Sequence, residues 1–148
     1  MAAITPVTFT GSYSVLRNAT AQANTGQTDW INRPAWAKYL LLYYNLTAVA
    51  GTTPEMTPSL LQADPVLRDD ASATTLATFT LMSAAADGYI QIGPGVTGIA
   101  DDVTTAATGD GVASVNLVLP ALIGVKLLLD RTTGDETYTY TLAAEFRA

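Results

Sequence analysis

Histidine and cysteine are both absent from this chain of 148 residues. Their absence excludes imidazole general bases, thiol nucleophiles, disulfides, and metal sites built from imidazole or thiolate ligands. Charged residues are also scarce, because they make up 14% of the chain against roughly 25% in an average soluble domain. We therefore expect the protein not to be an enzyme, to hold no cofactor and no metal ion, and to work as an interaction or structural domain.

Basic residues are the scarcer of the two charges. Seven Lys and Arg residues stand against thirteen Asp and Glu residues, which gives a net charge of −6. Binding to nucleic-acid phosphates requires clustered basic side chains, whereas the seven in this chain are scattered along it. We expect no nucleic-acid partner.

Long hydrophobic runs are missing as well. The longest, Tyr39 to Ala50, is interrupted by Asn45 and Thr47, and it is shorter than the roughly 20 residues with which a helix spans a bilayer. The first residues, Met1 to Val7, carry neither the basic region nor the apolar core of a secretory signal. We therefore expect no membrane partner, and synthesis and retention in a cytoplasm.

The sequence does contain a repeated alternation with a period of two. Along residues 138–146 apolar side chains alternate with threonine and charged residues, which is typical of a strand with one buried face. Residues 36–50 are apolar on both faces, which predicts a strand covered on both sides. Further strands are expected at 6–9, 13–16, 56–63, 75–81, 89–92, 95–99, 113–119 and 123–129. So many short strands separated by turn residues predict a single all-β domain, either a sandwich or a barrel.

The connections carry their own signals. Pro120 lacks a backbone donor and predicts a corner between strands. Gly134 lies between the last two apolar segments and predicts a hairpin that joins 123–129 to 138–146, with this glycine at positive φ.

Two segments are polar and rich in small residues, 18–28 and 101–111, and we expect loops or mobile arms there. The resulting division is an N-terminal arm with the first strands over residues 1–33, which we expect to form interfaces, and a β-sandwich body over residues 34–148.

An aromatic cluster between the polar arm and the main strand is the best candidate for an interface. It combines Trp30, Ile31, Arg33 and Trp36, and aromatic residues with arginine are common anchors of protein interfaces. We expect Trp36 to lie in the core and leave Trp30 open between core and interface. The second apolar face of the main strand, formed by Tyr39, Leu41 and Tyr43, needs cover from another chain. The candidate interface residues are Trp30, Ile31, Arg33, Trp36, Tyr39, Leu41 and Tyr43.

Acidic pairs offer an alternative that the sequence does not favour. Asp69 with Asp70, and Asp101 with Asp102, supply oxygen ligands of the kind that calcium takes. Adjacent side chains on an extended segment point in opposite directions, however, and no spacing matches a dedicated calcium loop. We interpret these residues as solvated acids on exposed loops.

The run from Ala37 to Pro54, followed by an extended segment with Gln62 and Asp64, resembles small virion proteins of tailed bacteriophages, of the head decoration or cement type. In those proteins a strand ends in a Thr-Ala-Val-x-Gly-Thr-x-Pro turn, which residues 47–54 match here, and a Tyr-rich strand closes the chain. The present chain departs from that pattern after Gln62, where Pro65 and Leu67 replace an acidic Asp-Gly turn followed by Trp.

The resemblance implies a jelly-roll-like β-sandwich with an extended N-terminal arm. It also implies a homotrimer that binds the major capsid protein on the outer surface of a phage head and stabilises the shell by bridging its subunits. The alternative is a carbohydrate- or receptor-binding β-sandwich of a phage tail or surface protein, in which Trp30, Trp36 and the tyrosines would contact sugars.

Overall fold

The computed structural model describes residues 3–22, 27–79, 82–96, 99–100, 111–129 and 133–148. In these ranges the chain forms ten strands and one short 3-10 helix, η1. The elements are β1 (Tyr13–Gln22), β2 (Gln27–Asn32), β3 (Tyr39–Ala50), β4 (Met56–Gln62), η1 (Asp70–Ser72), β5 (Thr74–Thr78), β6 (Ala86–Gly93), β7 (Ile99–Ala100), β8 (Gly111–Asn116), β9 (Leu122–Leu129) and β10 (Thr137–Arg147). No helix in the described ranges has the length and hydrophobicity needed to cross a membrane.

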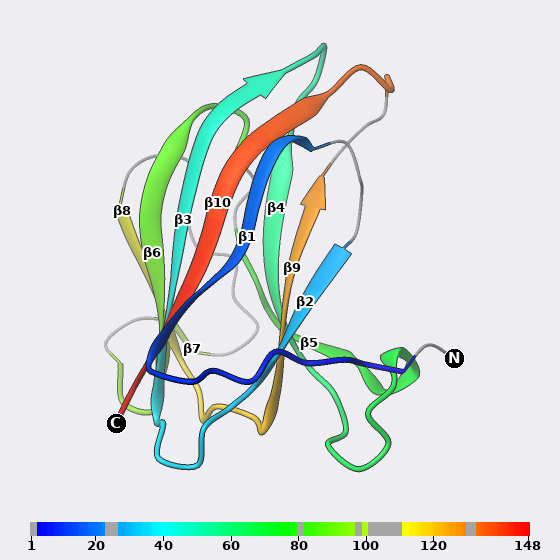
Figure 1. The fold of residues 1–148 in the computed structure, drawn as a ribbon. Coiled ribbons are helices and arrows are strands. Elements are labelled where there is room, and N and C mark those ends of the chain that lie inside the picture. Colours follow the sequence, from blue (N-terminus) through cyan, green and yellow to red (C-terminus); the bar gives the residue numbers. More distant parts are fainter. Residues whose placement is uncertain (1–2, 23–26, 80–81, 97–98, 101–110, 130–132) are drawn as a thin grey trace.

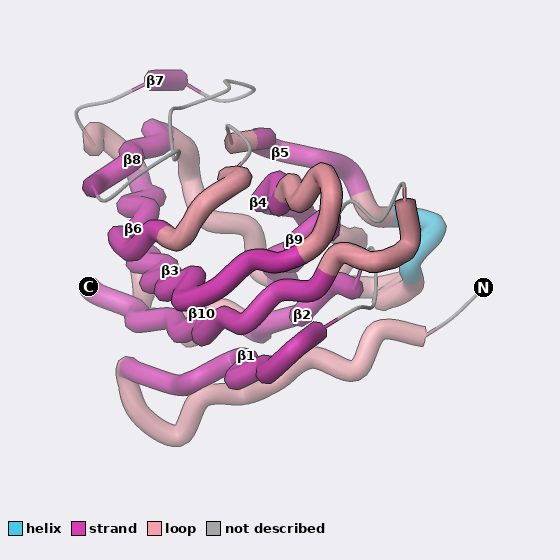
Figure 2. Tube along the Cα trace, turned by 90° about the horizontal axis from the view of Figure 1, so that it is seen from above, coloured by secondary structure: helices cyan, strands magenta, loops and turns pink. Residues whose placement is uncertain are grey.

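The strands form two sheets that face each other (Figures 1 and 2). One sheet has the order β1-β10-β3-β6-β8-β7, and the other has the order β2-β9-β4-β5. The pairs within β1-β10-β3-β6 and within β2-β9-β4-β5 are all antiparallel. β8 extends the larger sheet by parallel pairing with β6, and β7 pairs in parallel with β8.

This order is the jelly-roll arrangement. The first four strands alternate between the sheets, and β5 and β6 are added beside β4 and β3. The last two strands are inserted between earlier ones, so that β10 separates β1 from β3 and β9 separates β2 from β4. Two four-stranded antiparallel sheets connected in this way form the double Greek key of a jelly roll. The predicted all-β sandwich of jelly-roll type is confirmed.

The predicted hairpin between the last two long strands is wrong. β9 pairs with β2 and β4, whereas β10 pairs with β1 and β3, so the two strands lie in different sheets. Both strands place one apolar face toward the same core, and this alternation is identical for a hairpin and for a connection that crosses the sandwich. Gly134 does have the predicted positive φ, at 83°. The predicted corner at Pro120 is confirmed, because β8 and β9 also belong to different sheets.

The prediction of a loop over residues 18–28 is wrong for most of that segment. β1 continues to Gln22 and β2 begins at Gln27. The Arg17 guanidinium contacts the Asp29 carboxylate at 2.6 Å across the open edge between the sheets. Backbone pairing with β10 and with β9 holds these two polar segments as strands, and the polarity of the sequence does not reveal that pairing. The second polar segment, 101–111, lies outside the described residues except for its last residue, which begins β8.

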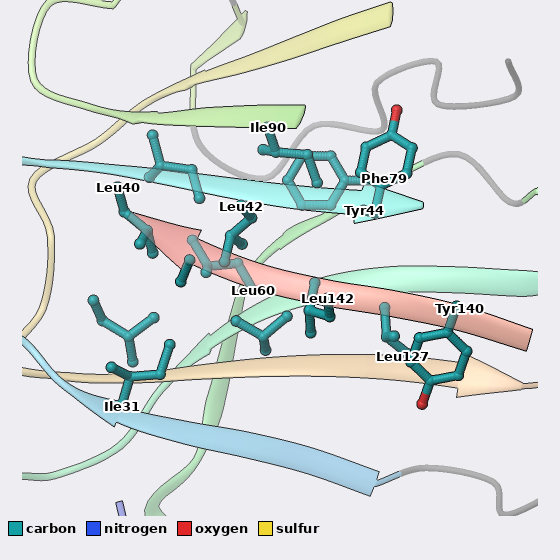
Figure 3. Close-up of a cluster of buried hydrophobic side chains, with 14 of the residues drawn as sticks. Ile31, Leu40, Leu42, Tyr44, Leu60, Phe79, Ile90, Leu127, Tyr140 and Leu142 are labelled. Atoms are coloured by element: carbon teal, nitrogen blue, oxygen red, sulfur yellow. The ribbon is translucent and has the colours of Figure 1, made fainter. Parts of the chain in front are cut away.

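The core lies between the sheets (Figure 3). The inner faces of β3 and β10 meet those of β4 and β9, and the larger side chains are fully enclosed. Figure 3 shows Leu42 and Leu142 facing Leu60 and Leu127 across this layer. Burial of each such side chain contributes about 1.5–3 kcal/mol to folding, which makes the two long central strands the main source of stability.

A smaller hydrophobic cluster covers the outer face of the four-stranded sheet. Trp30 lies over Gly124, where an added Cβ would come within 2.8 Å of the indole ring. Ile4, Ala63 and Leu122 complete the cluster. The smallest residue thus sits under the largest, which leaves Trp30 only 8% exposed.

The segment before β1 packs against its own sandwich. Val7 N–H donates to Trp30 O at 2.8 Å, and Asn32 N–H donates to Val7 O at 3.0 Å. Phe9 contacts Phe146 edge to face, with ring centroids 5.1 Å apart. The expected strand at 6–9 is therefore reduced to an isolated bridge between Val7 and Ile31. The division at residue 33 stays a prediction, although β1 and β2 are already members of the two sheets.

Candidate protein interface

Half of the exposed large hydrophobic side chains in the described ranges lie in the connections at one end of the sandwich. Four large ones lie in connections between strands: Trp36, Val66, Leu67 and Val118. The strand directions place the connections β2–β3, β4–β5 and β8–β9 at the same end, the lower one in Figure 1. We call residues 33–38, 63–73 and 117–121 the apolar end. The opposite end contains residues 51–55 and 133–136, which we call the polar end.

Val66 and Leu67 are held in solvent by a turn whose backbone N–H groups are bonded to Asp64. Both backbone N–H groups donate to Asp64 Oδ1, at 2.7 and 3.2 Å. Arg68 N–H donates to Asp64 O at 2.8 Å, and Asp64 N–H donates to Ser72 Oγ at 3.0 Å. Val66 is 84% exposed and Leu67 is 63% exposed. The turn therefore keeps two apolar side chains in water with their backbone already ordered.

Trp36 occupies a second ordered turn at the same end. Ala37 N–H donates to Pro34 O at 3.0 Å, and the Arg33 guanidinium donates to Ala37 O at 3.1 Å. Lys38 N–H donates to Arg147 O at 2.8 Å, which ties the turn to β10. Trp36 is nevertheless half exposed. The prediction that Trp36 lies in the core is wrong, because the tight turn directs it away from the sandwich.

The other predicted interface residues are divided between three environments. Ile31 points into the main core and is fully buried, while Trp30 is buried beneath the segment before β1. Arg33 is partly buried at the apolar end, where its Nε has no hydrogen-bond partner among the described residues. Tyr39, Leu41 and Tyr43 lie on the outer face of the six-stranded sheet, because their neighbours Leu40 and Leu42 face the core. The predicted residues therefore follow one another along the end of β2, its connection and the start of β3, but they do not share one surface.

The outer face of β3 is covered in part by its own sheet. An added Cβ on Gly93 would come within 2.3 Å of the Tyr39 ring, so this ring lies directly over the glycine. Leu41 is 5% exposed and stands between Glu145 and Gln91 in the register. Burial, followed by the charge of Glu145, raises the pKa of Tyr43. The expectation that another chain covers this face stays a prediction.

The polar end is built around an enclosed carboxylate. Glu136 is fully buried and accepts hydrogen bonds from Thr133 Oγ1 at 2.6 Å, Gly134 N–H at 3.0 Å and Thr53 Oγ1 at 3.2 Å. These bonds, that of the Thr133 hydroxyl foremost, lower the pKa of Glu136 from 4.5 to about 2, although burial acts in the opposite direction. The carboxylate therefore stays ionised and joins the β9–β10 connection to the β3–β4 turn.

The turn that carries the family resemblance is part of this network. Asp135 accepts from Thr52 Oγ1 at 2.9 Å and from Thr52 N–H at 3.3 Å. Gly51 has φ of 110°, and a Cβ there would lie 2.6 Å from Glu136 Cα. The glycine and the threonines of this turn therefore have a structural role within a single chain.

The acidic pairs do not converge in the described part of the chain. No group of three or more His, Cys, Asp or Glu residues there is arranged to hold a metal ion. Asp69 instead accepts from Ser72 N–H at 2.9 Å, at the start of η1. Asp101 and Asp102 lie outside the described residues.

Three interface features escaped the sequence reasoning. Val66 and Leu67 are not part of a periodic segment, and Val118 falls on the polar face of the strand expected over residues 113–119, so alternation alone does not mark them as interface candidates. The Asp64-Pro65 pair before Val66 is a turn signal that identifies the loop, but no local signal shows that its apolar side chains stay in solvent. Comparisons with family models, with curated proteins and with solved structures found no significant match for this chain.

Proposed function

We propose that this protein is a capsid decoration protein, which binds the outer surface of a phage head and stabilises it by bridging capsid subunits. In this proposal the partner is the major capsid protein, and the protein itself acts as a homotrimer. The apolar end is the attachment surface. No chemistry is required of the protein, because bridging acts only through added interface area.

One observation carries the proposal. Two hydrogen-bonded turns at one end hold Trp36, Val66 and Leu67 in solvent. Exposed apolar side chains lower solubility unless a partner covers them, and ordering them in advance reduces the entropy lost on binding. An end of this kind favours attachment to another protein over catalysis.

Fold and sequence add support by analogy. Jelly rolls occur in viral capsid domains and in lectins, so the fold is compatible with the proposal without selecting it. The resemblance of residues 47–54 to the turn of phage decoration proteins favours the capsid among these uses. The structural role of that turn at the polar end leaves the opposite end for binding.

The positions of the two tryptophans argue against the alternative function in the form that uses Trp30 and Trp36 together to bind a sugar. Sugar stacking on a Trp30–Trp36 pair requires both rings at the surface, whereas Trp30 is covered by Ile4 and its neighbours. A glycan-binding function therefore needs a different aromatic site.

The proposal is tested by mixing the purified protein with expanded phage heads that lack decoration protein. We expect a trimer by light scattering, co-sedimentation with the heads, and an increase in the temperature at which the heads disrupt. A protein that stays monomeric and neither binds nor stabilises the heads would contradict the proposal. Heads that bind the Val66→Ser, Leu67→Ser double variant as well as the wild type would contradict the assignment of the apolar end.

A further inference from the structure

A groove of about 310 Å³ crosses the outer face of the six-stranded sheet. Tyr13 on β1 forms one side, and Tyr43 on β3 with Tyr89 on β6 forms the other. Its floor includes Ala143 of β10, a small side chain that is 3% exposed. A small floor between aromatic walls leaves room for a flat ligand. The groove is separate from the apolar end, and the inference drawn from it does not rest on the proposed function.

The strand register arranges the lining in two rows. Ala143, Tyr43 and Tyr89 are direct neighbours across β10, β3 and β6. Two residues further along, Thr141, Asn45 and Asp87 are neighbours in the same way. Successive positions on one face of a strand are roughly 7 Å apart. A row with two aromatic rings thus runs beside a row of hydrogen-bonding side chains, and the distance between the two rows is about the width of one sugar ring.

The aromatic row is held in place before any ligand binds. The rings of Tyr43 and Tyr89 lie 5.7 Å apart with a tilt of 46°. Tyr43 Oη donates to Glu145 at 3.4 Å, and Arg147 Nε donates to the same carboxylate at 2.6 Å. These contacts fix the ring of Tyr43 from its hydroxyl end, and the ring lines the groove. A pre-ordered ring loses little entropy on binding.

The chemistry of the lining selects a class of ligand. A hydroxyl-rich ring needs groups that donate and accept, and the amide of Asn45, the carboxylate of Asp87 and the hydroxyl of Thr141 provide both. The groove has no Lys or Arg among its lining residues, and it includes an acid. An anionic ligand such as a phosphate or a sulfated sugar is therefore disfavoured.

We infer that this groove binds a neutral glycan, with one pyranose ring stacked on Tyr89 and bordered by Tyr43, and with its hydroxyls bonded to Asn45, Asp87 and Thr141. The volume lies at the lower limit of ligand sites, which begin at about 300 Å³, so it holds one or two sugar rings. Such a site gives the protein a weak adhesive function that is independent of its attachment to another protein.

The experiment probes the full chain against a printed array of neutral and acidic oligosaccharides, followed by calorimetric titration of the best neutral binder. We expect binding to neutral pyranose glycans. Tyr89→Ala and Asn45→Ala should each weaken it about tenfold, since each removes one contact worth about 1.4 kcal/mol. Tyr89→Phe keeps the ring and should retain most of the affinity.

Trp36→Ala is the matched control, because it removes an exposed aromatic side chain outside the groove. Asn45 is exposed, so Asn45→Ala tests the site even if Tyr89→Ala fails to fold. The inference is overturned if no neutral glycan binds at about 10 mM, if sulfated glycans are preferred, or if Trp36→Ala abolishes binding that Asn45→Ala leaves intact. The first two results leave the capsid proposal unaffected, whereas the third would place glycan binding at the apolar end.

Discussion

At the apolar end two turns hold Trp36 and Val66 in solvent, whereas at the polar end two connections enclose Glu136. Both ends use the same device, in which a carboxylate accepts hydrogen bonds from backbone N–H groups of a turn. Asp64 does so beneath Val66 and Leu67, and Glu136 does so inside the network with Thr133. The two ends differ because the turn at the apolar end exposes apolar side chains, whereas the connections at the polar end enclose the carboxylate itself.

The comparison shows that a hydrogen-bonded turn does not have to stabilise the fold. Buried groups at the polar end join two distant connections and should stabilise the fold. Exposed apolar groups at the other end are also carried by hydrogen-bonded turns but contact little of their own chain, so they should contribute little to folding. Surface order without a stabilising role is what a binding surface requires.

The largest contrast is expected between the two tryptophans that flank the turn into β3. Trp30→Ala removes a buried indole and should lower the free energy of unfolding by about 3–5 kcal/mol. Trp36→Ala removes a half-exposed one and should cost about 1 kcal/mol or less. Urea denaturation of both variants measures the difference. Equal losses would show that Trp36 supports the fold and would remove it from the binding surface.

Gly51→Ala should have the next largest effect. The added Cβ meets the backbone of Glu136 at 2.6 Å, in a left-handed conformation with φ of 110°. We expect a loss of about 3 kcal/mol, from backbone strain and the clash together. Gly134→Ala is the control in the same network, since its φ is 83° but nothing lies within 4 Å of the added Cβ. Gly134→Ala should cost about 1–2 kcal/mol. Equal costs for the two variants would argue against a close approach of residue 51 to the backbone of Glu136.

A change of pH tests the enclosed carboxylate directly. The folded-state pKa of Glu136 is lowered from 4.5 to about 2, so its contribution to stability is complete above the unfolded value and is lost as pH falls through the folded one. Wild-type stability should therefore decrease between pH 4.5 and 2 more steeply than that of Glu136→Gln. Thermal melts across this range measure both slopes, and parallel curves would show that Glu136 is not the group that titrates.

The smallest effect on stability is expected at the exposed turn. Val66→Ser with Leu67→Ser should change the free energy of unfolding by no more than about 0.5 kcal/mol, while attachment to heads is lost. Asp64→Ala leaves both apolar side chains but removes the acceptor of their N–H groups, and it should weaken attachment without abolishing it. A large loss of stability in the double variant would mean that these side chains pack in the free protein.

Much of the fold could be predicted because sheets impose a period of two. β3, β4, β6, β9 and β10 lie where alternation placed strands. Alternation reports which face of a strand is buried, but it does not report which sheet the strand joins. The pairing of β9 and β10 with different neighbours could not be derived, since Gly134 has the same positive φ in a connection between sheets as in a hairpin.

The candidate site was harder to predict for a related reason. Trp30 and Trp36 are alike in sequence, and the burial of Trp30 depends on Gly124 and on the segment around Ile4, which lie far away along the chain. The aromatic groove likewise requires Tyr13, Tyr43 and Tyr89 from three separate strands. Local patterns identified aromatic residues as important, and only the pairing of strands decides which of them share a surface.

Hydroxyl-radical footprinting of the protein, free and attached to expanded heads, tests the central claim most directly. The method reports the solvent exposure of individual side chains. If the apolar end is the attachment surface, labelling of Trp36, Val66 and Leu67 should be strong in the free protein and should fall on attachment. Unchanged labelling of these three side chains, together with new protection of residues 51–55 at the polar end, would contradict it.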